Sequence, residues 1–241
     1  MSAPLRLEGR TALVTGASRG IGAAVARRLA ASGARVALLA RSEAALRALA
    51  REIGPGAEVL ACDVRDTAAL SRALEELQAI IGGAPNIIVN NAGAFFIAPA
   101  QETSVDAFAE TLAVNLTAPF SVVRALLPAM VTAHNGHVVT IGSIADRATF
   151  PGNAAYAASK YGLRALHEVL RAELRASGVR LSLVSPGAVN TELWDAIDPD
   201  NAPGFTARAD MLSPEAVADA VHWVVTRPAE LNVDELRLSR S

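Results

Sequence analysis

Short apolar runs alternate with longer amphipathic segments along almost the whole chain, and this alternation limits the possible folds more than any other feature. Six runs rich in Val, Ile and Leu span residues 10–16, 34–40, 57–64, 86–93, 137–143 and 180–187. Segments with apolar residues at helical spacing span 20–32, 43–53, 67–81, 104–132, 154–176 and 214–226. Runs that are apolar on both faces suit parallel strands covered by helices. The pattern therefore predicts an α/β fold, a doubly wound parallel sheet with helices on both faces.

We expect residues 1–241 to form a single domain. The sequence has no linker, low-complexity tract or repeat of fixed period, although its length of 241 residues also fits two small domains. The least regular stretch is 191–212, which contains two prolines and one glycine and follows the sixth predicted strand. Because loops at the carboxyl ends of parallel strands cover ligands, 191–212 is a candidate substrate-covering loop.

The composition argues against several classes of protein. With 51% hydrophobic and 19% charged residues, the chain can bury a sizeable core. A net charge of −2, with arginines scattered rather than clustered, argues against a nucleic-acid partner. The first residues lack the order of a signal peptide, and no apolar run approaches the roughly 18 residues of a membrane span. We therefore expect a cytoplasmic protein with no membrane partner.

Cysteine and histidine do not suggest a metal site. Cys62 is the single cysteine and lies in an apolar run, so we expect a buried thiol without a disulfide partner. His134 and His137 flank an Asn-Gly pair, which is typical of a surface turn, and no third ligand is evident. We expect no metal.

A glycine-rich segment, "TGASRGIG" over residues 15–22, directly follows the first predicted strand and opens the first predicted helix. Gly16, Gly20 and Gly22 permit a tight turn, a close approach to a pyrophosphate and close packing of helix on strand. The N-terminus of the helix offers free N–H groups to the anion. The segment therefore predicts a dinucleotide site.

The end of the second predicted strand indicates which dinucleotide binds. An acidic residue there accepts hydrogen bonds from the ribose hydroxyls, but this chain has Arg41 and Ser42. Arg41, helped by Arg19, is suited to a 2′-phosphate, which predicts NADP(H) over NAD(H). The alternative is a solvated arginine at the start of a helix, which leaves NAD(H) possible. Asp63, at the tip of the third predicted strand, either meets the adenine or caps a helix.

The segment "YAASKY", residues 156–161, holds both tyrosines and the single lysine of the chain. Tyr156 and Lys160 are four residues apart, so a helix places them on one face. A nearby ammonium stabilises a phenolate, so we expect Lys160 to lower the pKa of Tyr156. Tyr161 lies about 100° further around the helix and is expected at a packing surface.

Taken together and in this order, the motifs resemble those of the short-chain dehydrogenase/reductase family over nearly the whole chain. They are "TGASRGIG" at 15–22, "NNAG" at 90–93, Asn115, Ser143, Tyr156 with Lys160, and "PGAVNTEL" at 186–193. The resemblance implies a Rossmann-like NAD(P)-binding catalytic domain that transfers a hydride between nicotinamide and a carbonyl or alcohol.

The resemblance also implies a role for each of the matching residues. Tyr156 is the general acid or base, Ser143 binds the carbonyl oxygen, Lys160 contacts the nicotinamide ribose, and Asn115 holds a relay water. With the positions argued above, the expected cofactor contacts are Gly16, Ser18, Arg19, Gly20, Ile21, Gly22, Arg41, Ser42, Asp63, Val64, Asn90, Ala92, Gly93, Tyr156, Lys160, Pro186, Gly187, Val189 and Thr191.

We therefore predict an NADP(H)-dependent oxidoreductase acting on a small or medium carbonyl compound or secondary alcohol. The alternatives are the same chemistry with NAD(H) or a 3-oxoacyl substrate, and a catalytically silent dinucleotide-binding sensor or scaffold. Phe95, Phe96, Phe150 and Trp194 follow predicted strand ends and form either a substrate wall or part of the core. Family members associate through the helices near 104–132 and 154–176, which implies a homodimer or homotetramer.

Overall fold

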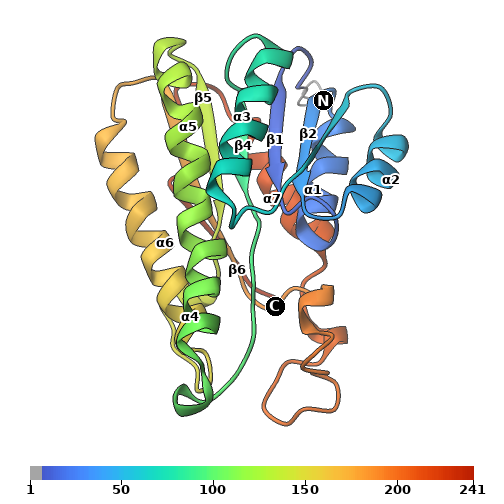
Figure 1. Ribbon diagram of the computed structural model, residues 1–241, viewed down its shortest axis with the longest axis vertical. Helices are drawn as coiled ribbons and strands as arrows, with labels where there is room; N and C mark the ends of the chain where they lie inside the picture. The colour runs from blue at the N-terminus through green and yellow to red at the C-terminus, as the bar shows by residue number, and fades with distance from the viewer. Residues whose placement is uncertain (1–6) are drawn as a thin grey trace.

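The centre of the fold is a sheet of parallel strands. The computed structural model describes residues 7–241, and within them seven strands form one sheet in the order β3-β2-β1-β4-β5-β6-β7 (Figure 1). The strands are β1 (Thr11–Thr15), β2 (Arg35–Ala40), β3 (Ala57–Ala61), β4 (Ile87–Asn90), β5 (Gly136–Ile141), β6 (Val179–Pro186) and β7 (Glu235–Leu238). All neighbouring pairs run parallel, which confirms the predicted fold class.

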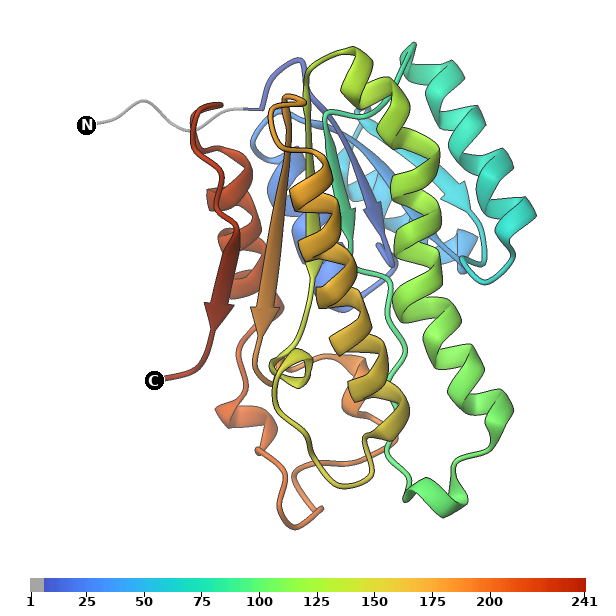
Figure 2. The same cartoon turned by 90° about the vertical axis from the view of Figure 1, so that its left-hand side faces the viewer.

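The helices pack on the two faces of this sheet and bury two separate apolar clusters (Figure 2). They are α1 (Gly20–Ala30), α2 (Glu43–Ile53), α3 (Thr67–Ile81), α4 (Val105–Leu112), α5 (Ala118–Thr132), α6 (Ala154–Glu173) and α7 (Pro214–Val225). Helices α1, α2 and α7 cover one face, while α3, α5 and the end of α6 cover the other. Side chains of Ser42, Asp66, Ser104 and Ser213 accept N–H groups at the starts of α2, α3, α4 and α7.

A π-helical turn, Ala113–Thr117, interrupts the helix that the sequence predicts over 104–132. Such turns add a residue to the helical ladder and often occur at functional sites. Here the turn contains Asn115, which is 1% exposed. By length and apolar composition alone Val105–Thr132 would be able to cross a membrane, but its α5 part packs on the sheet, and core helices of soluble proteins pass the same test.

Two local predictions differ from the structure. The strand β7 is missing from the six predicted runs because its exposed Glu235 and Arg237 alternate with leucines, so no continuous apolar run appears. His137 does not lie in a surface turn: β5 begins at Gly136, and His137 is 1% exposed with its Nε2 2.8 Å from the hydroxyl of Ser182. Burial lowers the pKa of His137 to about 3.

The order of the strands fixes where a ligand can bind. The first strand, β1, pairs with β2 on one side and with β4 on the other, so the chain winds outward in both directions from this point. Open α/β sheets bind ligands outside the carboxyl ends of the strands at such a reversal. In Figure 2 the strand arrows point down toward this edge, and the orange segment that includes 191–212 lies beyond it.

Candidate active site

A cleft of about 1110 Å³ runs along the carboxyl ends of the strands. Loops after β1 to β6 line it, together with part of the segment 191–212. The predicted site residues that line it are Gly16, Ser18, Arg19, Gly20, Ile21, Arg41, Ser42, Asp63, Val64, Ala92, Gly93, Ser143, Tyr156, Lys160, Pro186, Gly187, Val189 and Thr191. Gly22, Asn90 and Asn115 are not among the lining residues.

Backbone geometry shapes the end of the cleft near α1. Gly16 has a φ of +67°, which favours glycine, and a Cβ there would lie 2.8 Å from the Cα of Ala92. Gly22 lies one turn into α1, where a Cβ would be only 2.2 Å from the carbonyl oxygen of Gly16. Gly22 therefore lets the helix pack closely on the loop and does not itself face the cleft.

This glycine end of the cleft fits an anionic dinucleotide. No side chain caps the N-terminus of α1, and its first turn holds no acidic residue. The first N–H groups of a helix lack partners within the helix, so those of α1 remain available to a pyrophosphate. Arg19 and Arg41 also line the cleft, whereas the tip of β2 carries no carboxylate. The residues present are those that a phosphorylated cofactor needs.

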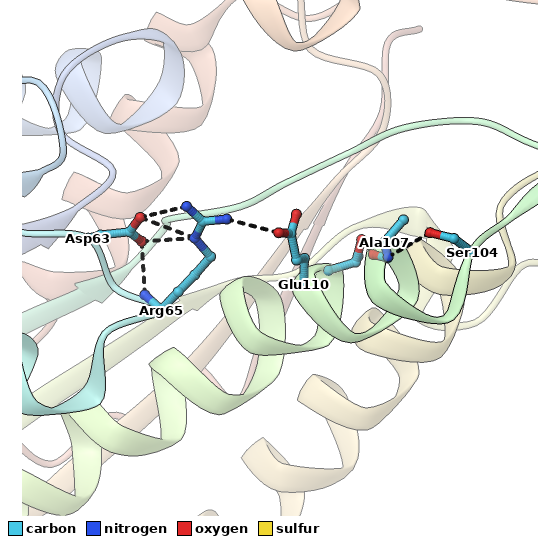
Figure 3. Close-up of polar contacts among 6 residues, drawn as sticks. Asp63, Arg65, Ser104, Ala107 and Glu110 are labelled. Carbon is cyan, nitrogen blue, oxygen red and sulfur yellow. Dashed lines mark hydrogen bonds and ion pairs between the residues drawn. The ribbon is translucent and has the colours of Figure 1, made fainter.

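Next to Arg41, a cluster of charged residues crosses the cleft from β3 to α4 (Figure 3). The guanidinium of Arg65 lies 2.8 Å from the carboxylate of Asp63 and 3.3 Å from that of Glu110. The hydrogen bond from Arg65 holds the pKa of Asp63 below its usual range. Asp63 does not cap α3, because Asp66 accepts the N–H groups of Ala68 and Ala69 there. The sequence reasoning overlooked Arg65.

The side chains of Asn90 and Asn91 lie in different places, and the predicted cofactor contact of Asn90 stays a prediction. Asn90 is 3% exposed and lines a separate small cavity with Thr140 and His167, and its side chain makes no hydrogen bond within the described residues. Asn91 lines the cleft instead, and its amide donates to the carbonyl oxygen of Thr15 at 3.0 Å. Successive strand residues point to opposite faces, so Asn91 lines the cleft and Asn90 does not.

Asn115 fixes the backbone that leads into the site. Its side-chain oxygen accepts the N–H of Ala94 at 2.7 Å, while its amide donates to the carbonyl of Ala94 and to the Ser159 hydroxyl. The Ser159 hydroxyl in turn donates to the carbonyl oxygen of Tyr156 at 2.7 Å. Asn115 thus links the loop after β4 to the first turns of α6.

Tyr156 and Ser143 meet at the other end of the cleft. Tyr156 is partly exposed and lines the cleft. Burial raises the pKa of Tyr156, the hydrogen bond with Ser143 opposes this, and the nearby Asp146 raises it further. The structure therefore contradicts the predicted lowering, because burial outweighs the stabilisation of a phenolate.

Lys160 is held close to Tyr156. It is 6% exposed, its Nζ donates to the carbonyl oxygen of Ile141 at 2.9 Å, and it lies 5.7 Å from the centre of the Tyr156 ring. Burial lowers the pKa of Lys160 to about 8, while Asp146 acts in the opposite direction. The ammonium is thus poised to lose its proton only slightly above neutral pH.

Asp146 is a charged residue that the sequence reasoning missed. Its side chain is fully buried, accepts the Ser185 hydroxyl at 2.5 Å and pairs with Arg147 at 2.7 Å. Arg147 continues to Glu235 of β7 at 2.6 Å. The network joins the Ser143 turn to β6 and β7, and its carboxylate raises the pKa of both Tyr156 and Lys160. A single aspartate beside a predicted serine gives no sequence pattern that would reveal it.

The four aromatic residues that the sequence singled out all line the cleft, which supports the substrate-wall alternative over core packing. They are Phe95, Phe96, Phe150 and Trp194.

Cys62 is 7% exposed, and burial raises the pKa of its thiol. The described residues include no group of three or more metal-ligating side chains.

Comparisons with known proteins agree with the geometry of the cleft. The model of the family described as short chain dehydrogenase matches residues 10–202. A D-threitol dehydrogenase of Mycolicibacterium smegmatis is 36% identical over 94% of this chain and 89% of its own length.

Solved structures are also similar. A metagenomic short-chain oxidoreductase in complex with NADP has a TM-score of 0.84 at 37% identity, covering 98% of both chains. A gluconate 5-dehydrogenase from Burkholderia cenocepacia, in complex with NADP and tartrate, has a TM-score of 0.87 at 30% identity, covering 98% of this chain and 95% of its own.

Proposed function

Because the chain belongs to the short-chain dehydrogenase/reductase family, we propose that it interconverts a small or medium carbonyl compound and its secondary alcohol with NADP(H). The observation that carries the proposal is the convergence of Ser143, Tyr156 and Lys160 in the same cleft as the uncapped N-terminus of α1. One end of the cleft suits the phosphates of a dinucleotide, and the other offers a proton donor.

When bound, the nicotinamide supplies the hydride that reaches the carbonyl carbon. Tyr156 donates its phenolic proton to the carbonyl oxygen, so the products of reduction are the alcohol, the oxidised cofactor and a phenolate that is reprotonated. Ser143, which bonds to Tyr156, orients the same oxygen. A phenol with a raised pKa stays protonated at neutral pH, which suits the direction of reduction.

Lys160 supports this proton transfer from within the protein. With a pKa near 8 it is mostly an ammonium at neutral pH, and it stabilises the phenolate that forms when Tyr156 gives up its proton. An arginine would keep the charge but not the compact shape that fits between Tyr156 and the carbonyl oxygen of Ile141.

Three observations support NADP(H) over NAD(H). Arg41 and Arg19 line the cleft, the tip of β2 has no carboxylate, and similar structures were solved with NADP. We assign the 2′-phosphate to Arg41, whose planar guanidinium binds phosphate oxygens in pairs.

Initial rates of carbonyl reduction with NADPH and with NADH test this assignment. We expect Arg41→Ala to raise the KM for NADPH roughly 10- to 100-fold, since a charge-assisted hydrogen bond contributes about 1.5–3 kcal/mol. The KM for NADH should change little. The control is Arg51→Ala on the exposed side of α2, which should leave both values unchanged. Faster turnover of the wild-type protein with NADH at equal concentration would refute the assignment.

The remaining proposals concern the chain as a whole: a single catalytic domain over 1–241, a substrate cover formed by 191–212, and a cytoplasmic homodimer or homotetramer. Exposed apolar side chains on α5 and α6 support the association of copies: Phe120, Tyr161 and Val169 are 44%, 42% and 54% exposed. Sedimentation as a monomer would contradict the last of these proposals.

A further inference from the structure

Aromatic rings form a continuous wall that leads to Tyr156. Phe205 contacts Trp194 at 6.1 Å between ring centres, Trp194 contacts Phe95 at 5.1 Å, and Phe95 contacts Tyr156 at 4.8 Å. Each pair meets edge to face, the arrangement that aromatic rings prefer. The three other rings come from two distant segments, the loop after β4 and the segment 191–212.

Phe205 and three further large apolar side chains at this end of the cleft are exposed. Phe150 is 43% exposed, Ile144 40%, Phe205 38% and Leu193 37%, and all four line the cleft. Apolar surface gathered in a concave site indicates a ligand that covers it. The indole N–H of Trp194 already donates to the carbonyl oxygen of Val189 at 3.1 Å, so this ring offers an apolar surface only.

The charges of the cleft are distributed unevenly. Arg19, Arg41 and Arg65 belong to the loops after β1, β2 and β3, at the cofactor end. Among the described residues that line the cleft, Lys160 is the one cationic side chain beside Tyr156. Its Nζ donates a hydrogen bond to the carbonyl oxygen of Ile141.

Arg208, in the segment 191–212, does not supply a second cation. It is absent from the cleft lining, and its guanidinium bonds to Asn190, to Asp195 and to the carbonyl oxygen of Thr191. A substrate carboxylate placed along the aromatic wall would therefore lose its hydration without gaining a charged partner, which disfavours its binding.

We propose that the substrate is an uncharged ketone carrying an aryl or other bulky apolar group, or the corresponding secondary alcohol, and that anionic carbonyl compounds are poor substrates. The proposal rests on the proposed function, since it places the reacting carbonyl at Tyr156. The apolar group lies against Phe95, Trp194 and Phe205, with the neutral side chains of Asn153 and Thr206 also lining the cleft.

Initial rates with NADPH on a matched pair of ketones test the proposal. Acetophenone and 4-acetylbenzoate share the reacting group and differ by one carboxylate. We expect kcat/KM to be at least about 100-fold higher for acetophenone, equivalent to about 2.7 kcal/mol at 1.36 kcal/mol per factor of ten. Equal values, or a preference for the carboxylate, would overturn the proposal.

The two tryptophans of the chain provide a matched pair of variants. Trp194→Ala should lower kcat/KM for acetophenone roughly 2- to 13-fold, because it removes an edge-to-face contact with the aryl group. Trp223→Ala removes the other indole, which is 44% exposed on α7 beside Arg227, and should leave kcat/KM unchanged. An equal loss of kcat/KM in both variants would count against binding of the substrate at the aromatic wall.

A binding measurement separates this proposal from the proposed function. Acetophenone should quench tryptophan fluorescence in the wild-type protein and in Trp223→Phe, but not in Trp194→Phe. If no carbonyl compound is turned over and this quenching is still observed, the proposed function fails and the aromatic site stands. If acetophenone does not quench while other ketones are reduced, the aromatic site fails and the proposed function stands.

Discussion

The glycine loop at one end of the cleft is shaped by the backbone of a single segment, whereas the Tyr156 end is built from side chains of several segments. The first end is formed by the loop of Gly16 and the uncapped start of α1, within eight residues of one segment. The second joins Ser143, Tyr156, Phe95 and Trp194 from four separate segments. The shape of the glycine end therefore depends on local backbone geometry, while that of the Tyr156 end depends on the packing of the whole sheet.

The largest expected effect is a loss of turnover, caused by a change at the Tyr156 end alone. Tyr156→Phe removes the proton donor and keeps the ring that packs on Phe95, so we expect kcat to fall about 100- to 10,000-fold, the usual contribution of general acid catalysis. The Kd for NADPH, measured by fluorescence titration, should change little because the glycine end is untouched.

Tyr161→Phe is the matched control for this prediction. Tyr161 is 42% exposed one residue beyond Lys160, and its hydroxyl has no place in the proposed proton transfer. Turnover should be unaffected in this variant. Retained turnover in Tyr156→Phe would remove Tyr156 from the mechanism and with it the contrast between the two ends.

A smaller effect is expected from Asp146→Asn, which changes charge but not volume. Asp146 raises the pKa of Lys160 and of Tyr156, so its removal lowers both. Reduction needs both groups protonated, and the wild-type alkaline limb of kcat/KM is expected near the Lys160 pKa of about 8. In the variant this limb should move to lower pH, as measured by a pH–rate profile.

The far end of the same network supplies the control for the pH shift. Glu235→Gln removes the carboxylate that pairs with Arg147 on its other side but leaves Asp146 in place. Its alkaline limb should coincide with that of the wild-type protein, although its melting temperature falls. A limb that shifts equally in both variants, or in neither, would show that Asp146 acts through structure alone.

Much of the fold was predictable because its signals are local. Runs apolar on both faces marked six strands, and glycines after the first of them marked the turn into α1. The predictions failed where the structure of a segment depends on its neighbours in the fold. The edge strand β7 is half polar, His137 is buried by strands that pair with β5, and the π turn at Ala113–Thr117 follows from packing rather than from composition.

The site shows the same division. The motifs predicted most of the residues that line the cleft, because each motif identifies residues that directly follow a strand. The sequence could not show that Asn91 and not Asn90 faces the cleft, since that depends on the parity of β4. Nor could it show that burial raises the pKa of Tyr156, or that the buried Asp146 bonds to Ser185 of β6 and pairs with Arg147.

The most direct test of the central claim, that a cofactor whose phosphates bind at the glycine end passes a hydride from its nicotinamide to a carbonyl held at Tyr156, is isotope transfer from labelled NADPH. The wild-type protein is incubated with acetophenone and NADPH carrying deuterium at the reactive face of C4, and the alcohol is analysed by mass spectrometry. We predict one deuterium on the carbinol carbon of each product molecule. An alcohol without deuterium, or no alcohol from any ketone tested, would contradict the account.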